Sequence, residues 1–147
     1  MKLLVTSDIH GDLGTLEAVV RRHSDVDMHI DAGDMCLPQA VIARFPMAGV
    51  KGNNDFGSSL PLMRTIEIGG VTIFLSHGHI EHVKFSLERL AVKAGLHEAD
   101  IAIFGHTHRK HLSTINGITM LNPGALSGRH GSYAIYENGK VTFHDAH

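Results

Sequence analysis

The chain has 147 residues, of which 43% are hydrophobic and 19% are charged. This composition is typical of globular proteins and excludes a largely disordered chain, and the length suits one domain over residues 1–147 with a core that needs no disulfide support. The formal net charge of −2 disfavours a protein that holds nucleic acid through a broad basic face.

The N-terminal stretch and the cysteine content bear on where the protein works. The first apolar run ends at Val5 and the acidic Asp8 follows it, so we expect no secretory signal peptide. No apolar run approaches the roughly 20 residues that a membrane span requires. The only cysteine is Cys36, which cannot form an internal disulfide and which we expect to pack in the core. The cytoplasm is therefore the simplest expected location.

The first third of the chain alternates between strand and helix patterns. Short apolar runs predict strands over residues 2–7, 28–32 and 47–51. Apolar residues at helical spacing predict a helix over 12–22, and Pro38 at a first-turn position favours a second one over 38–45. Strands that alternate with helices in this way are typical of a parallel sheet in an α/β protein.

The rest of the chain favours antiparallel pairs. Gly69-Gly70, Asn116-Gly117 and Asn138-Gly139 predict three hairpins, whose strands cover 64–68 with 71–76, 111–115 with 118–121, and 132–137 with 140–144. One helical stripe spans 83–94 with Gly95 as its C-cap, and a buried strand is expected over 101–104. The predicted fold class is α/β (α+β in some schemes), with two packed mixed β-sheets flanked by helices.

Polar residues follow nearly every predicted core strand, at the point where the strand ends. The residues of this set are Asp8, His10, Asp34, Asn53, Asn54, Asp55, His77, His79, His106, His108 and Asn122. The set includes five of the 13 histidines in the chain. Ligands of α/β sheets bind outside the carboxyl ends of strands, so we expect these side chains to converge. Carboxylate, amide and imidazole ligands together suit Mn, Fe, Zn, Ni or Co.

The order of these short motifs resembles the calcineurin-like metallophosphoesterases, and among them the small, cap-less bacterial and archaeal phosphodiesterase branch. The resemblance is carried by Asp8-Ile9-His10, Gly33-Asp34, Gly52-Asn53-Asn54-Asp55, Ser76-His77-Gly78-His79 and Gly105-His106-Thr107-His108. The segment Leu121-Asn122-Pro123-Gly124-Ala125 extends it. The resemblance implies the metallophosphoesterase sandwich fold and a metal-dependent phosphoric ester hydrolase, a phosphodiesterase or phosphatase with a small organic phosphate ester as substrate.

The same resemblance implies a centre of two divalent metal ions, with manganese as the first choice. Asp8, His10 and His108 would hold one ion, Asn53, His77 and His106 would hold the other, and Asp34 would bridge both. Such ions lie roughly 3.5–4 Å apart and clamp a phosphoryl group during in-line displacement by a hydroxide that they hold.

Catalytic or substrate-binding roles are predicted at three further positions: catalysis at Asn54 and Asp55, and substrate binding at Asn54 and Arg129. Larger family members carry histidine where this chain has Asn54, which can hydrogen-bond a phosphate oxygen but is no useful general acid. Asp55 is expected to keep the place of the carboxylate that orients that histidine. Arg129 is a candidate for binding the substrate phosphate, with a solvated loop position as the alternative.

The other histidines have several readings. His79 could touch solvent, substrate or the residues around the metal ligands, or it could bind a metal directly. His111 and His130 lie near motifs and are candidates for approaching the cleft. We expect the remaining six on the surface: His23, His29, His82, His97, His144 and His147.

Two other functions compete with hydrolysis of small esters. One is a nuclease, which the absence of a basic stripe disfavours. The other is a non-catalytic interaction module, because a eukaryotic sorting-complex subunit has this fold with altered metal ligands. All seven expected ligand positions here hold the residue types that the family uses, which argues against the second alternative. The sequence predicts no oligomeric state.

Overall fold

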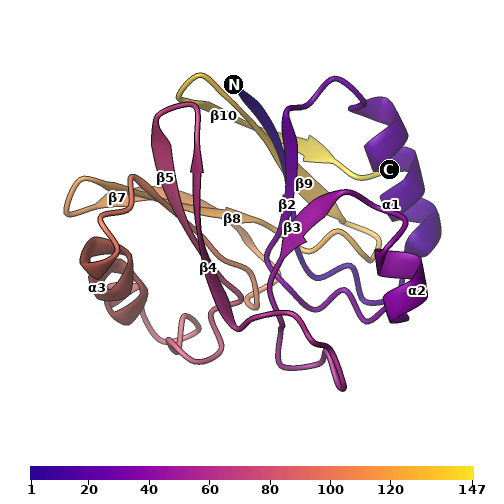
Figure 1. The fold of residues 1–147 in the computed structure, drawn as a ribbon, viewed down its shortest axis with the longest axis horizontal. Helices are drawn as coiled ribbons and strands as arrows, with labels where there is room; N and C mark the ends of the chain where they lie inside the picture. Colours follow the sequence, from indigo (N-terminus) through magenta and orange to yellow (C-terminus); the bar gives the residue numbers. More distant parts are fainter.

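Two five-stranded sheets pack face to face in the computed structural model, which describes residues 1–147 (Figure 1). The first sheet has the order β10-β9-β1-β2-β3, where β1 (Lys2–Thr6), β2 (Met28–Asp31) and β3 (Met47–Gly49) are parallel. The remaining two strands, β9 (Ser132–Glu137) and β10 (Lys140–Asp145), form an antiparallel hairpin that continues this sheet beyond β1.

The second sheet has the order β4-β5-β6-β8-β7. Parallel pairing joins β5 (Val71–Ser76) to β6 (Ile101–Ile103) and β6 to β8 (Ile118–Pro123). Antiparallel partners, β4 (Met63–Ile68) and β7 (Lys110–Ile115), close the two edges. Both sheets are therefore mixed, and the predicted fold class with its three hairpins is confirmed.

The central core lies between the sheets because side chains alternate across each strand. In β1, Leu3 and Val5 point inward and pack in one buried cluster with residues such as Ile73 and Ile103 of the second sheet. Leu4, between them, belongs to a different cluster on the outer face of the first sheet. This alternation fixes the register of the strand and thereby the direction in which the chain leaves it at Ser7.

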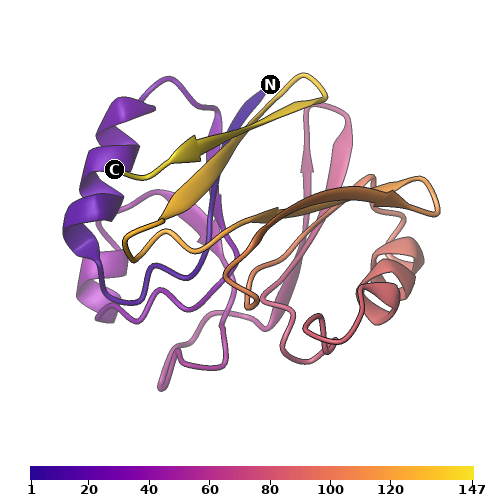
Figure 2. The ribbon, with the colours of Figure 1, turned by 180° about the vertical axis from the view of Figure 1, so that it is seen from behind.

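Helices cover the outer faces of the two sheets (Figures 1 and 2). Helix α1 (Leu13–Arg22) buries Leu16 and Val19 against the first sheet, and its N-cap Asp12 accepts a hydrogen bond from the backbone N–H of Thr15. Helix α3 (Glu88–Leu96) packs Leu90 against the second sheet. No helix in the structure has the length and apolar character needed to cross a membrane.

Two predicted helices are shorter in the structure than in the sequence pattern. Helix α2 covers only Gln39–Ile42, with Pro38 as its N-cap. Helix α3 begins at Glu88, although Val83 does pack in the same apolar cluster, as predicted. Residues 83–87 run through turns instead, in which the N–H of Phe85 donates to the carbonyl oxygen of His82. Helix α3 also passes through Gly95 and is capped by His97.

Candidate metal centre

The loops that follow β1, β2, β5 and β6 meet at one end of the sandwich, at the lower edge of Figure 1. Backbone hydrogen bonds join them: the N–H of Asp8 donates to Gly33, that of His10 donates to Asp34, and that of Gly105 donates to His77. Parallel strands explain this convergence, since their carboxyl ends lie on the same side of a sheet.

The backbone is strained at five of the seven expected ligands. These residues have positive φ angles although none is glycine: Asp8 (54°), His10 (46°), Asp34 (59°), His106 (72°) and His108 (63°). Such conformations cost free energy and gather at functional sites, where the surrounding structure holds them in place. Four of the five, Asp8, His10, Asp34 and His108, supply atoms to the two groups of possible metal ligands described next.

The first group of ligand atoms comes from Asp8, His10 and His108. Asp8 Oδ1 lies 3.2 Å from His108 Nε2 and 3.5 Å from His10 Nε2, and the two histidine Nε2 atoms are 3.3 Å apart. Asp8 is fully buried, whereas His108 is half exposed. The sequence predicted these three residues as the ligands of one ion, and the structure brings them together.

The second group comes from Asp8, Asp34 and His77. His77 Nε2 lies 3.3 Å from Asp34 Oδ2 and 4.0 Å from Asp8 Oδ1. His77 Nδ1 is 2.8 Å from the carbonyl oxygen of Ala32, so Nδ1 carries the hydrogen in that bond and Nε2 faces the two carboxylates. Asp34 Oδ2 is also 3.9 Å from His10 Nε2 and so faces imidazoles of both expected sites.

The charges of this group reinforce one another. Burial opposes the charge of His77, but its contacts with Asp34 and Asp8 outweigh that effect and raise the pKa of its imidazole. Burial also opposes the charge of Asp34 and by itself would raise the pKa of that carboxyl. His77 and the hydrogen bonds from Asn54 outweigh this effect and hold the pKa of Asp34 well below its usual range. Asp34 is therefore an anion at neutral pH, as a metal ligand must be.

Two buried atoms in these groups, Asp8 Oδ1 and His77 Nε2, have no hydrogen-bond partner. Buried polar atoms without partners are rare because they lose their hydration without compensation. A divalent cation that prefers oxygen and nitrogen ligands would satisfy both atoms together. The residues therefore fit a metal, and the fit rests on unpaired buried atoms as well as on residue type.

The two remaining expected ligands, His106 and Asn53, do not belong to either group of ligand atoms. The rings of His106 and His77 have centroids 5.1 Å apart, and the backbone N–H of His106 donates to Asp8 Oδ2. Burial, together with the neighbouring charges of His77 and Lys84, lowers the pKa of His106 to about 4, so this ring is neutral. Asn53 is exposed on the turn after β3, and its side chain makes no hydrogen bond.

Asn54 and Asp55 take different positions within that turn. Asn54 is exposed, and its Nδ2 donates to Asp34 Oδ2 at 2.9 Å while its backbone N–H donates to Asp34 Oδ1 at 2.8 Å. Asp55 is buried and accepts backbone N–H groups of Asp34, Gly52 and Cys36. Asp55 thus ties the loops after β2 and β3 together, which differs from the expected role of orienting a side chain.

Other predicted positions lie farther from the ligand groups. Arg129 and His130 are exposed and form no side-chain hydrogen bond or ion pair; the loop instead contacts the centre through Ser127, whose Oγ donates to the carbonyl oxygen of Asp8. His79 is half-buried, with its ring 5.5 Å from that of His77. Asn122 supports the ligand loop by donating to the Gly105 carbonyl and to Thr107 Oγ1.

Two expectations about burial were wrong. Cys36 is exposed rather than in the core, because its left-handed φ of 53° turns the side chain toward the centre, where Sγ lies 3.8 Å from His10 Nδ1. His29 is buried rather than on the surface, because β2 is covered there and Thr6 Oγ1 provides a partner for Nε2 at 2.7 Å.

Sequence reasoning also missed residues that hold the centre in place. Ser7 Oγ donates to Asp8 Oδ2 at 2.6 Å. The buried Glu81 contacts Ser76 Oγ and receives a 2.7 Å hydrogen bond from Lys93 of α3, which anchors the loop after His79. Ser7 adjoins a motif and could have been suspected, but the Glu81–Lys93 pair depends on where α3 packs and has no local signal.

Comparison with known proteins identifies the family. Residues 1–140 match the family model of the calcineurin-like phosphoesterase superfamily domain. The chain is 34% identical over 140 residues to the probable metallophosphoesterase YsnB of Bacillus subtilis, covering 92% of this chain and 83% of that protein. It is 27% identical to the phosphodiesterase MJ0936 of Methanocaldococcus jannaschii, covering 87% and 86% of the two chains.

Solved structures agree with this assignment. A predicted phosphoesterase from Streptococcus pneumoniae superimposes with a TM-score of 0.88 at 30% identity, over 99% of this chain and 89% of that one. Vps29 of Entamoeba histolytica shares the fold alone, with a TM-score of 0.80 at 24% identity over 98% and 97% of the chains. The chain therefore belongs to the calcineurin-like phosphoesterase superfamily and is a hydrolase of phosphoric esters.

Proposed function

We propose that this chain is a phosphodiesterase that hydrolyses small organic phosphate esters with two divalent ions, manganese being the first choice. The observation that carries the proposal is the meeting of two buried carboxylates and three imidazoles around unpaired ligand atoms. The diester preference is supported by similarity to a relative named as a phosphodiesterase. If the diester preference fails, the chain still belongs to the family.

Seven residues would hold the ions in this proposal. Asp8, His10 and His108 form one set, and Asn53, His77 and His106 form the other, with Asp34 between them. When bound, such ions would lower the pKa of a water molecule, and their positive charge would offset the negative charge of the phosphoryl oxygens. That charge explains how a protein with a net charge of −2 acts on an anion.

The chain's own groups orient this centre. Asp34 stays ionised, and Asn54 fixes its carboxylate through two hydrogen bonds. The free hydrogen of the Asn54 amide can reach a substrate oxygen, but an amide does not deliver a proton to a leaving group. We therefore infer that the leaving group departs without a proton from Asn54.

The interaction-module alternative rests on the fold shared with Vps29. Asp8 Oδ1 and His77 Nε2 favour the catalytic proposal, because in a module that binds no metal both atoms would stay without a hydrogen-bond partner, and only the contacts with His108 and Asp34 would offset their lost hydration. The nuclease alternative has no observation in its favour.

A metal-reconstituted assay tests the proposal. Protein stripped with a chelator and reloaded with Mn²⁺ is expected to hydrolyse bis(4-nitrophenyl) phosphate faster than 4-nitrophenyl phosphate, and His77→Ala should remove both activities. Lys140→Gln, on the exposed start of β10, is the matched control. Faster cleavage of the monoester would overturn the diester preference, and no cleavage of either ester by metal-loaded protein would overturn the catalytic proposal.

A further inference from the structure

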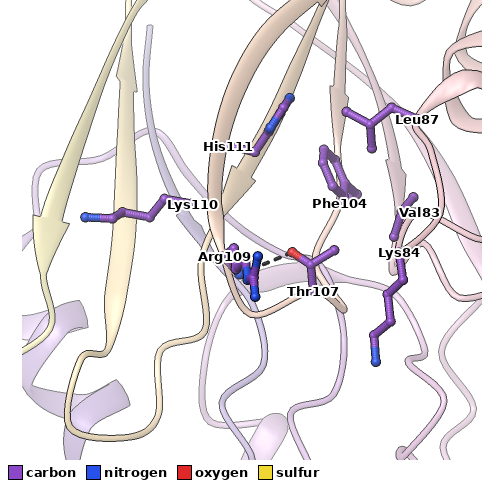
Figure 3. A pocket seen from close by; sticks show the side chains of 8 residues that line it. All are labelled: Val83, Lys84, Leu87, Phe104, Thr107, Arg109, Lys110 and His111. Carbon is purple, nitrogen blue, oxygen red and sulfur yellow. Dashed lines mark hydrogen bonds between the residues drawn. The ribbon is translucent and has the colours of Figure 1, made fainter.

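A pocket of about 530 Å³ lies beside the loop that carries His106 and His108 (Figure 3). It is formed by the loop before α3, the end of β6 and the loop into β7. Its wall combines an apolar side with polar groups, and the residues that matter for the argument are Val83, Lys84, Leu87, Phe104, Thr107 and Arg109. None of these residues belongs to the expected metal ligands.

The pocket is lined by three cationic side chains, Lys84, Arg109 and Lys110, and by no anionic one. Neither Lys84 nor Arg109 has a carboxylate within 4.0 Å, and no acidic residue lines the pocket. Thr107 Oγ1 accepts hydrogen bonds from the backbone N–H of Arg109 and from Asn122 Nδ2, which leaves its own hydroxyl hydrogen free to donate. Unpaired cations and a free hydroxyl together select an anion.

The residues of the pocket adjoin the loops that carry expected metal ligands. Thr107 lies between the expected ligands His106 and His108, and Arg109 follows them in the chain. The backbone N–H of Val83 donates to the carbonyl oxygen of Gly78, which directly follows the expected ligand His77. In Figure 3 the side chains of Arg109 and Lys84 lie on either side of Thr107, whereas Lys110 extends away from them.

Leu87 supplies the accessible apolar surface of the pocket. Phe104 and Val83 are almost fully buried and form the floor behind it, whereas Leu87 is only partly buried against the same cluster. The exposed part of Leu87 suits the carbon skeleton of a substrate, because apolar groups gain by leaving water. The pocket thus offers an apolar contact and a cationic rim next to the loops that carry expected metal ligands.

We propose that this pocket binds a second phosphate group, carried on one arm of the phosphodiester substrate, through Arg109, Lys84 and Thr107. The proposal rests on the phosphodiesterase function proposed above and narrows its substrate class to diesters with an additional anionic arm. Arg109 forms two parallel hydrogen bonds to phosphate oxygens, Lys84 adds a point charge, and the carbon skeleton lies against the exposed part of Leu87.

A matched pair of substrates tests this. Thymidine 5′-(4-nitrophenyl phosphate) is compared with the same compound carrying a 3′-phosphate, using Mn²⁺-loaded protein. The wild type is expected to show a kcat/KM about tenfold higher for the 3′-phosphorylated compound, corresponding to the gain from one solvent-exposed charged contact. The double variant Lys84→Gln/Arg109→Gln should reduce that ratio to near one, and Lys140→Gln should preserve it.

Equilibrium binding separates this proposal from the catalytic one. Calorimetry on the same metal-loaded protein is expected to give about tenfold tighter binding of thymidine 3′,5′-bisphosphate than of thymidine 5′-phosphate, and this difference should vanish in the double variant. If neither diester is cleaved, the proposed function fails while the binding difference still decides the pocket. Equal binding of the two nucleotides, no binding of either, or a preference that persists in the double variant would overturn the proposal.

Discussion

Asp8 and His77 face each other inside the metal centre, with Asp8 Oδ1 4.0 Å from His77 Nε2 and neither atom hydrogen-bonded. The opposite atom of each side chain is held: Asp8 Oδ2 accepts from Ser7 and from the N–H of His106, and His77 Nδ1 is bonded to the Ala32 carbonyl. The scaffold thus fixes both side chains while one ligand atom of each stays free.

Gly105 controls the position of Asp8. A Cβ atom at Gly105 would lie 2.0 Å from Ser7 Oγ and 2.7 Å from Asp8 Oδ2. Gly105→Ala should therefore displace Asp8, weaken metal binding at least tenfold and lower the free energy of unfolding by about 1–3 kcal/mol. Metal titration and urea unfolding measure the two effects.

Gly14→Ala is the matched control for that substitution. Gly14 lies inside α1, and no atom stands within 4 Å of an added Cβ. This variant should gain about 0.5–1 kcal/mol from helix propensity and keep the metal affinity of the wild type. Wild-type metal binding by Gly105→Ala would mean that the Ser7–Asp8 contact does not set the ligand geometry.

Asp55 should matter for stability more than for chemistry. Its carboxylate accepts three backbone N–H groups in a buried site, and Asp55→Ala would leave those donors unpaired. We expect a loss of about 3 kcal/mol or more in the free energy of unfolding, since each unpaired buried donor costs roughly 1–3 kcal/mol. Glu17→Ala, which breaks an exposed pair with Arg44, should cost less than about 1 kcal/mol. Equal costs would contradict this role for Asp55.

Asp31 and His29 give stability two opposed pH dependences, and both lie 2.7 Å from Thr6 Oγ1. Burial raises the pKa of Asp31 to about 7 from 3.8, so between these values the folded state holds a proton that the unfolded chain has lost, and stability falls as pH rises. Burial lowers the pKa of His29 to about 4 from 6.5, so over that range the unfolded chain binds the extra proton and stability rises with pH.

Single substitutions should separate these two contributions. In chelator-treated protein, Asp31→Asn should make stability rise more steeply between about pH 4 and 6.5 than it does in the wild type, whereas His29→Gln should make the slope lower than in the wild type. His106, whose pKa is also lowered to about 4, contributes equally to all three proteins. Denaturant unfolding at a series of pH values gives the three slopes. Changes of slope with the same sign in both variants would show that these buried groups do not carry the pH dependence.

The sequence predicted which side chains gather at this end of the sandwich wherever a residue closely follows a short buried strand. Asp8, His77 and His106 each come shortly after a short buried strand, and the end of that strand determines where the residue lies. The strand pairs around Gly69-Gly70 and Asn116-Gly117 were equally local, because two-residue turns define the register of both strands.

Features that depend on tertiary packing could not be predicted. The burial of His29 requires a partner on β1, Thr6, and the exposure of Cys36 follows from a left-handed backbone. The pocket with Lys84 and Arg109 forms only because the turns before α3 bring residues 83–87 next to the loop after β6. The stripe from Val83 to Ala94 has helical spacing throughout, so periodicity alone could not reveal those turns.

Asn54 leads to a prediction about leaving groups. Without a side-chain acid at this position, the rate should fall steeply as the leaving-group pKa rises, and nitrophenyl esters should react much faster than alkyl esters. Asn54→His should narrow the difference only modestly, because both Asp55 oxygens already accept backbone N–H groups and do not orient a new imidazole. Rates for diesters with graded leaving groups give the slope. A flat dependence, with chemistry rate-limiting, would identify another donor, with His79 as the first to examine.

The metal content of the protein tests the central claim most directly. Elemental analysis of manganese-loaded wild type should give two ions per chain, and Asp34→Ala should lose metal from both sites because Asp34 Oδ2 faces His77 and His10 together. Asp25→Ala, at an exposed surface pair with Lys2, should retain two ions. A wild type that binds none after loading, or an Asp34→Ala variant that keeps two ions and full activity, would contradict the account.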